Sequence, residues 1–175
     1  MKMKTLWRFL PIILITIYSC SPKKEKGELV YFSGRIANAQ TDSIYLLLNN
    51  REKAFALDFD GNFSDTVQLV DEGYKTLSIE REEFTIYLIP GDSLILNTDL
   101  KHLENNFKFS GIGKNRNNYL VDKSFKTDKF LTDHTELFKL APPDFKNQIK
   151  KFHQKVFENL EKLEVNSSFI KTEKT

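Results

Sequence analysis

Short runs of alternating apolar and polar residues fill the chain from Leu29 to Gly111, and they constrain the fold more than any other feature. In one such run Phe84, Ile86 and Leu88 share a face, and the residues between them share the other. About eight runs occur, separated by turn sequences at regular intervals. This spacing predicts an antiparallel β-sandwich or barrel-like domain of about eight strands over residues 29–111, rather than alternating β and α units.

Glycine-containing turn sequences divide the strand series. Asp60-Gly61 predicts a hairpin, because glycine adopts a positive φ at no steric cost. Glu72-Gly73 predicts a second turn. Pro90-Gly91-Asp92 predicts a third, in which proline presets φ and glycine permits a type II turn.

The spacing of apolar residues becomes helical after Gly111, so we expect an α-helical extension over residues 112–165. Apolar residues from Phe145 to Leu163 recur three and four apart, and Pro143 suits a first helical turn, which predicts an amphipathic helix over 143–164. Such an apolar stripe does not stay exposed. We expect it to pack within this chain; the alternatives are a protein partner or a downstream domain. Residues 166–175 are polar and are expected to be frayed.

Residues 1–19 have the pattern of a bacterial lipoprotein signal peptide. An apolar run, Phe9–Tyr18, follows positively charged residues, and Ile17-Tyr18-Ser19-Cys20 resembles a loose lipobox. The run is about half the length of a membrane-spanning helix, for which about 20 apolar residues are needed, and it contains Pro11. Plain secretion with cleavage elsewhere is the alternative. We expect cleavage before Cys20, lipid attachment at Cys20 and a polar tether over residues 20–28.

Composition then limits the chemistry of the remaining chain. Cys20 is the only cysteine, so its lipidation leaves no thiol for a disulfide or for redox catalysis. The whole chain has 26 basic and 24 acidic side chains, but Lys2, Lys4 and Arg8 lie in the leader, which has no acid. The rest is close to neutral. We therefore expect no nucleic-acid partner.

Three motifs suggest ligands but fit simpler interpretations. Gly111-Ile112-Gly113-Lys114 lacks the spacing of a phosphate-binding loop and favours a strand-to-helix turn. The histidines are too far apart in sequence to predict a zinc site. The acidic residues around Asp58 and Asp60 do not match a calcium loop and favour a solvated hairpin tip. The sequence therefore predicts no catalytic, cofactor-binding or metal-binding residue, and no cofactor.

The order of several short motifs resembles the N-terminal region of TlpA/ResA-like lipoprotein thiol–disulfide oxidoreductases of Bacteroidota type, over roughly residues 16–165. Besides Cys20, the motifs are Phe32-Ser33-Gly34-Arg35-Ile36, Ile44-Tyr45-Leu46, Leu57-Asp58-Phe59-Asp60-Gly61-Asn62-Phe63, Tyr87-Leu88-Ile89-Pro90-Gly91-Asp92-Ser93-Leu94, and Phe109-Ser110-Gly111-Ile112-Gly113 followed by Asn117-Asn118-Tyr119-Leu120. The resemblance implies a β-domain without assigned chemistry, a helical connector and then a thioredoxin domain with a W-C-x-x-C motif. No second cysteine is present here, and Trp7 is the only tryptophan. The redox residues of that family therefore have no counterparts.

These observations predict a membrane-anchored, non-catalytic lipoprotein module with a scaffold or partner-docking role. The helix over 143–164 is the expected docking element, for a protein partner or a downstream thioredoxin domain. A stand-alone ligand- or partner-binding lipoprotein is the alternative. In bacteria of this type, acidic residues after the lipidated cysteine tend to mark export to the cell surface. Residues 21–26 are mainly basic, so we expect attachment to the outer membrane, facing the periplasm.

Overall fold

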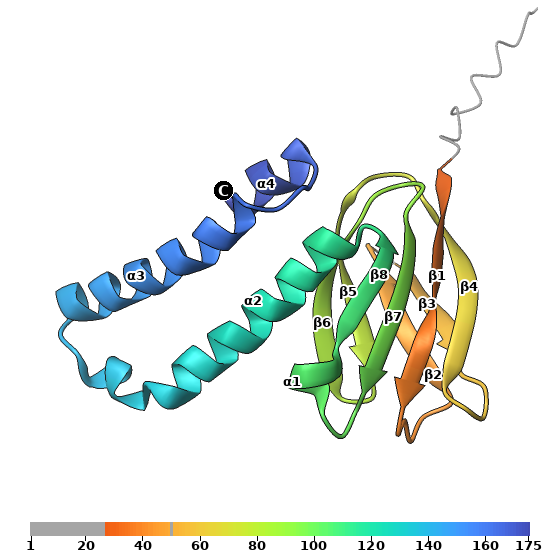
Figure 1. The fold of residues 1–175 in the computed structure, drawn as a ribbon, viewed down its shortest axis with the longest axis horizontal. Helices are drawn as coiled ribbons and strands as arrows, with labels where there is room; N and C mark the ends of the chain where they lie inside the picture. Colours follow the sequence, from red (N-terminus) through yellow and green to blue (C-terminus); the bar gives the residue numbers. More distant parts are fainter. Residues whose placement is uncertain (1–26, 50) are drawn as a thin grey trace, which may run out of the picture.

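The computed structural model describes residues 27–49 and 51–175, which form a two-layer β-sandwich and a helical arm (Figure 1). The predicted signal peptide, the lipid site at Cys20 and nearly all of the predicted tether lie outside the described residues. Only Gly27 and Glu28 of the tether are described, and Glu28 already opens the first strand.

Eight strands form two sheets of four. The first sheet has the order β4-β1-β7-β8, and the second has the order β3-β2-β5-β6. The strands are β1 (Glu28–Ala37), β2 (Ser43–Leu48), β3 (Arg51–Ala56), β4 (Asn62–Leu69), β5 (Gly73–Ile79), β6 (Glu82–Leu88), β7 (Ser93–Asp99) and β8 (Lys108–Ile112). The predicted sandwich of about eight strands is confirmed; the sheets do not close into a barrel.

The sandwich core consists of the inward-facing residues of both sheets. Phe32, Phe55 and Phe63 pack edge-to-face, with ring centroids 5.0 to 5.9 Å apart, and join β1 and β4 of one sheet to β3 of the other. Two polar contacts connect the edge strands β3 and β4. Lys53 pairs with Asp65, and Arg51 Nη2 donates to the Gln68 carbonyl at 3.0 Å. These contacts satisfy polar groups at the two strand edges that the arm does not cover.

Two details of the strand pairing differ from the sequence prediction. β1 pairs with β7 in parallel, with Tyr31 opposite Ser93, so the first sheet is mixed. The predicted hairpin at Asp60-Gly61 is wrong, because β3 and β4 belong to different sheets and the chain crosses between them here. Gly61 approaches β1 closely, and its carbonyl accepts a 2.9 Å bond from the Ile36 N–H. This close approach, rather than a two-residue hairpin, explains the glycine.

Helices follow the sandwich and form the arm. A short helix, α1 (Leu103–Asn106), precedes β8. The arm comprises α2 (Lys114–Asp133), the 3-10 helix η1 (Thr135–Lys139) and α3 (Pro142–Leu160), which turns back toward the sandwich (Figure 1). α2 starts at the end of the sandwich where β1 begins, called the N-terminal end below. The helical extension predicted from the sequence is thus present, with Pro142 and Pro143 in the first turn of α3.

The last residues form a docked helix rather than the frayed tail predicted for 166–175. α4 (Ser167–Glu173) buries Phe169 completely against Tyr87 of β6 and Tyr119 of α2, at ring-centroid distances of 5.0 and 6.0 Å. One large aromatic side chain can hold so short a helix in place, because its burial removes a large apolar area from water. The polar composition of this segment concealed that contact.

Candidate functional site

The first turn of α2 joins the edges of both sheets through two consecutive asparagines. Asn117 exchanges two hydrogen bonds with the backbone of Tyr87 in β6: its Oδ1 accepts at 2.7 Å and its Nδ2 donates at 3.0 Å. Asn118 does the same with Phe109 in β8, at 2.7 and 2.9 Å. Each side-chain amide therefore forms the two hydrogen bonds that the backbone of a further strand would form. It does so at a sheet edge, where backbone N–H and C=O groups otherwise lack partners. The two sheets and the arm therefore meet at these two asparagines, and Val121 and Phe125 of α2 pack on the sandwich core beyond them.

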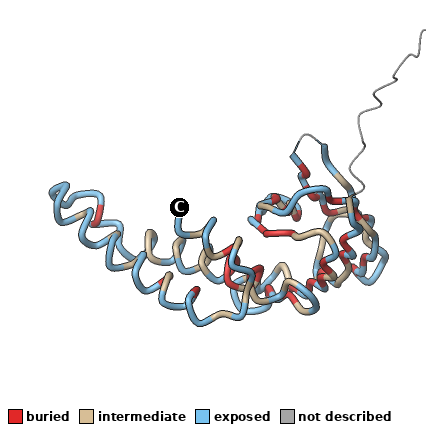
Figure 2. The backbone as a smooth tube through the Cα atoms, turned by 90° about the horizontal axis from the view of Figure 1, so that it is seen from above, coloured by how far each residue is buried: buried red, intermediate tan, exposed pale blue. Residues whose placement is uncertain are grey.

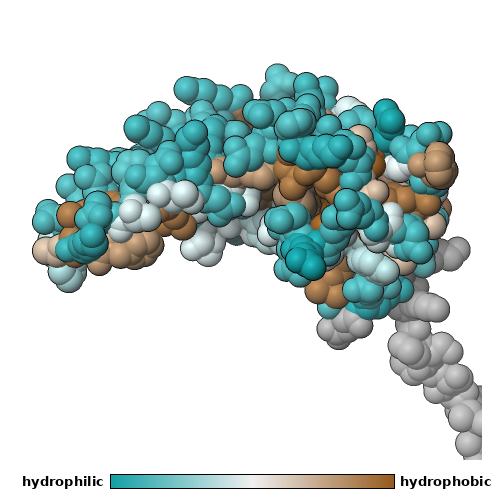
Figure 3. All heavy atoms as spheres, turned by 90° about the horizontal axis from the view of Figure 1, so that it is seen from below, coloured by the Kyte–Doolittle hydropathy of each residue, from teal (hydrophilic) through white to brown (hydrophobic). Residues whose placement is uncertain are grey.

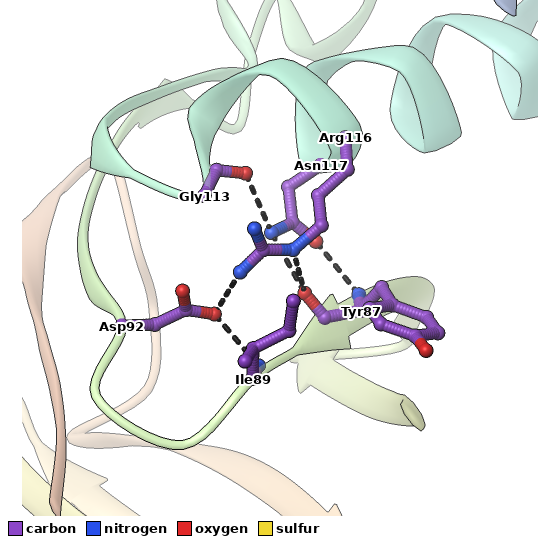
Figure 4. Close-up of polar contacts among 6 residues, drawn as sticks. All are labelled: Tyr87, Ile89, Asp92, Gly113, Arg116 and Asn117. Carbon is purple, nitrogen blue, oxygen red and sulfur yellow. Dashed lines mark hydrogen bonds and ion pairs between the residues drawn. The ribbon is translucent and has the colours of Figure 1, made fainter. Parts of the chain in front are cut away.

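A buried ion pair between Arg116 and Asp92 lies beside the Asn117 amide (Figure 4). Arg116 donates from Nη2 to Asp92 and from Nε to the Tyr87 carbonyl at 3.0 Å. Asp92 Oδ2 also accepts the Ile89 N–H at 2.8 Å, within the turn between β6 and β7. Both charged side chains are about 95% buried. Buried charges of this kind need a partner and hydrogen bonds, and both are present.

Gly113 gives the chain the geometry that brings Arg116 to Asp92. The residue has a φ of 98°, and an added Cβ would lie 2.6 Å from Arg116 Nη2. Glycine is therefore required here both for its left-handed backbone and for space. β8 ends at Ile112 and α2 begins at Lys114. The predicted strand-to-helix turn at Gly111-Ile112-Gly113-Lys114 is thus confirmed.

A tyrosine-rich contact joins α4 to the outer face of the second sheet. Tyr74 and Tyr87 pack edge-to-face at 5.2 Å, and the Tyr74 hydroxyl bonds to Glu173. Glu173 also accepts a 2.7 Å bond from Lys123 of α2, and its side chain is only 3% exposed. Burial, together with the negative charge of Glu173, raises the pKa of both Tyr74 and Tyr119 above the ordinary range. Both hydroxyls therefore stay neutral at physiological pH.

An open groove lies next to this contact, between β5, β6, α2 and α4. Its volume is about 520 Å³ and its lining is mainly polar, with Glu83, Lys123, Asp128 and Glu173 among the charged side chains. Charges of both signs and hydroxyl groups can bind a small polar ligand. The lining offers no nucleophile paired with a general base, which hydrolytic catalysis would require.

The apolar stripe of α3 is only partly covered, contrary to our expectation that packing within the chain would bury it. Val156 and Leu160 are buried near α4, whereas Phe145, Ile149 and Phe152 are half-buried. At the far end of the arm Phe138 and Leu140 are 67% and 40% exposed. Buried residues gather in the sandwich and at the junction, the arm is mostly exposed (Figure 2), and hydrophobic residues gather at its far end (Figure 3).

The structure also places the residues that the sequence suggested as ligands. The Asn62 side-chain amide donates to the Asp58 carboxylate at 3.0 Å, and the N–H groups of Asn62 and Asp60 donate to Asp58 Oδ1 at 2.8 and 2.9 Å. These bonds, the side-chain bond first, lower the pKa of Asp58. The turn is solvent-exposed, as predicted, but it connects two sheets and is not the predicted hairpin tip. Across residues 27–49 and 51–175, no three histidine, cysteine or acidic side chains cluster as a metal site would require. None of the helices in that part of the chain is both long and apolar enough to cross a bilayer.

Comparisons with known proteins add little. No family model matches the chain, and no curated protein matches it. One matching solved structure is a candidate cell adhesion protein from Bacteroides ovatus ATCC 8483, with 11% sequence identity. The match covers 49% of this chain and 43% of that chain, with a TM-score of 0.29. Likeness at this level supports no argument about fold or function. The structure itself defines the class: a two-sheet sandwich whose helical arm is joined to it by hydrogen bonds and a buried ion pair.

Proposed function

We propose that this chain is a membrane-anchored, non-catalytic lipoprotein module that docks a protein partner through its helical arm. The observation that carries the proposal is the combination of a rigid junction with an incompletely buried arm. Buried polar residues, namely Asp92, Arg116 and Asn117, fix the first turn of α2 to the sandwich. The arm then extends away with Phe145 and Ile149 half-buried and Phe138 exposed.

A fixed arm suits docking because an arm that is already positioned loses little conformational entropy on binding. Half-buried aromatic and aliphatic side chains are typical of the centre of a protein interface, where a few residues contribute most of the binding energy. The resemblance to the N-terminal region of TlpA/ResA-like lipoproteins adds a candidate partner, a thioredoxin domain, either downstream in a longer chain or on a separate protein. The proposed location is the outer membrane, facing the periplasm.

The groove beside Tyr74 favours a second function, that of a stand-alone ligand- or partner-binding lipoprotein. Its volume of about 520 Å³ lies within the usual range of small-molecule pockets, roughly 300–1,000 Å³. Lys123 and Asp128 supply opposite charges on one helix, α2. In this alternative the arm is a structural cover for the groove rather than the docking element.

Partner capture from membranes separates the two functions. We expect the double variant Phe145→Asp/Ile149→Asp to lower recovery of cross-linked partner at least about tenfold, because interface anchors contribute about 1.4 kcal/mol or more each. The control is Phe59→Asp, a fully exposed position in the turn between β3 and β4. The groove variant Glu83→Lys/Asp128→Lys keeps the Lys123–Glu173 pair and should leave capture unchanged. Loss of the partner in the groove variant alone would instead support the ligand-binding alternative.

A further inference from the structure

The outer face of the first sheet is divided into an uncharged half and a charged half. At the N-terminal end the outward positions form three rows across the strands. The first holds Gln68 and Leu29; the second holds Thr66, Tyr31, Ser93 and Ile112; the third holds Ser64, Ser33, Ile95 and Ser110. None of these side chains is charged. Charged residues appear on this face only at the other end, with Arg35, Lys108 and Asp99.

The uncharged half carries exposed apolar side chains. Leu29, Tyr31, Ile95 and Ile112 are 46%, 55%, 41% and 64% exposed. Such a surface can leave water without the cost of desolvating an ion. Tyrosine and aliphatic residues together are typical of surfaces that lie at the boundary between lipid and water, where a ring can be buried while its hydroxyl stays hydrated. We call the four residues the sheet patch.

The second sheet differs at the corresponding place. There α4 covers the outward-facing Tyr87 and contacts Tyr74. Among residues 27–49 and 51–175, no comparable helix covers the sheet patch, as its exposed fractions show. α4 thus covers one end of the outer face of the second sheet. Elsewhere on that face Tyr45 and Leu47 are 38% and 46% exposed. Glu83 and Glu52 lie in the same rows as these two residues, whereas the rows of the sheet patch hold no charged side chain.

The short segment between Cys20 and β1 indicates what covers the sheet patch, namely the bilayer. Gly27 lies seven positions after Cys20, and an extended chain spans at most about 3.6 Å per residue, so the lipid site lies within about 25 Å of the N-terminal end of the sandwich. β1 enters the sheet at this end, beside Leu29 and Tyr31. The uncharged half of the face thus lies next to the proposed membrane anchor, and the charged half lies away from it.

A second copy of the chain fits this surface less well. Strand spacing and rise give the uncharged half an area of roughly 400 Å², about half of the 800 Å² that each partner of a stable complex usually buries. A bilayer imposes no such minimum, because the lipid on Cys20 already holds the chain at the surface. Charges of both signs lie around this end: Glu28 at the start of β1, Asp71 and Glu72 in the turn between β4 and β5, and Lys114 at the start of α2. Zwitterionic lipid is therefore the appropriate surface.

We propose that the sheet patch lies against the bilayer to which Cys20 attaches the chain, so that the sandwich rests on its first sheet at the N-terminal end. This inference rests on the membrane anchoring in the proposed function. The contact would fix the orientation of the sandwich, and with it the direction in which the rigid arm extends from the membrane surface.

Quenching by brominated lipid tests the contact. The lipid-modified protein is prepared from a precursor that carries Trp7→Phe, so that any uncleaved chain also lacks the native tryptophan. Reporters are introduced as Tyr31→Trp in the sheet patch or Tyr45→Trp on the outer face of the second sheet. Each protein is bound to phosphatidylcholine vesicles whose acyl chains carry bromine near the headgroup. Interfacial side chains reach about 5–10 Å into this region, so the Tyr31→Trp indole should lose about half of its fluorescence. The Tyr45→Trp indole should lose none.

Flotation of the vesicles separates failure of the contact from failure of the anchor. If the chain floats with the vesicles but both indoles are quenched equally or not at all, anchoring stands and the contact is wrong. If the Tyr31→Trp indole is shielded from acrylamide in water but not quenched by the lipid, protein covers the patch, either the leader or a second copy, and the contact is again wrong. If the lipid-modified chain does not float, the anchor fails and the contact fails with it.

Discussion

Single buried polar residues decide how this molecule is assembled. Asn117 and Asn118 each pair with the edge strand of a different sheet, and Arg116 neutralises Asp92 between them. Sequence reasoning noted these positions only as part of a motif. Their role depends on β6 and β8 being edge strands of opposite sheets, and strand order is not visible in the alternation of apolar residues.

The ion pair leads to a prediction about stability. Arg116→Met leaves the Asp92 carboxylate buried without its cation, which typically costs about 3–5 kcal/mol, so we expect the free energy of unfolding to fall by about that amount. Urea titration followed by circular dichroism measures the change. Asp92→Asn in the same chain removes the orphaned charge and keeps an acceptor for the Ile89 N–H. The double variant Asp92→Asn/Arg116→Met should therefore be more stable than Arg116→Met alone.

The matched control is an exposed ion pair on the arm. Glu136 and Lys139 are more than 70% exposed, so Glu136→Gln should change the free energy of unfolding by less than about 1 kcal/mol. An Arg116→Met variant as stable as the Glu136→Gln variant would show that the buried pair does not hold the junction together.

At the scale of elements, the sandwich, the helical extension and the helix α3 could be predicted, but the bounds of α2, the parallel pair and the last helix could not. Alternation and turn residues in segments such as Phe84–Leu88 report which face of a strand is buried, not which strands become neighbours. β1 and β7 therefore gave no sign of parallel pairing. α4 lacks a periodic pattern because one residue, Phe169, makes most of its buried contact.

Docking of α4 can be tested through that one side chain. Phe169→Ala removes a fully buried ring that contacts Tyr87 and Tyr119, and Phe-to-Ala changes in cores cost about 3–5 kcal/mol. This loss lowers the free energy of locally opening α4. Hydrogen exchange of the α4 amides should therefore accelerate by about 100-fold or more, while the β-strand amides keep their rates. Phe138→Ala, at an exposed ring, should leave α4 unchanged. Equal exchange in both variants would mean that Phe169 does not secure α4.

At the scale of the whole molecule, the proposed function depends on where the chain is attached. The junction makes the sandwich and the first turn of α2 one unit, so an anchor near Glu28 would set the distance of both from a membrane. The sequence alone supports the anchor, because Cys20 lies outside the described residues. The neutral, cysteine-free remainder of the chain is consistent with a module whose work is to position a partner.

Lipid attachment gives the last prediction. Cells fed a fatty-acid analogue should incorporate it into the wild-type protein, and Cys20→Ser should abolish the label, because the Cys20 thiol and the amine freed by cleavage before it are the expected acylation points. Ser21→Ala keeps the cysteine and should keep the label. Each acyl chain contributes about 0.8 kcal/mol per buried methylene, so two or more chains hold a protein stably on a bilayer. A free Cys20 thiol in the wild-type protein, detected by mass spectrometry, would remove the anchor and require another explanation for the exposed sheet patch.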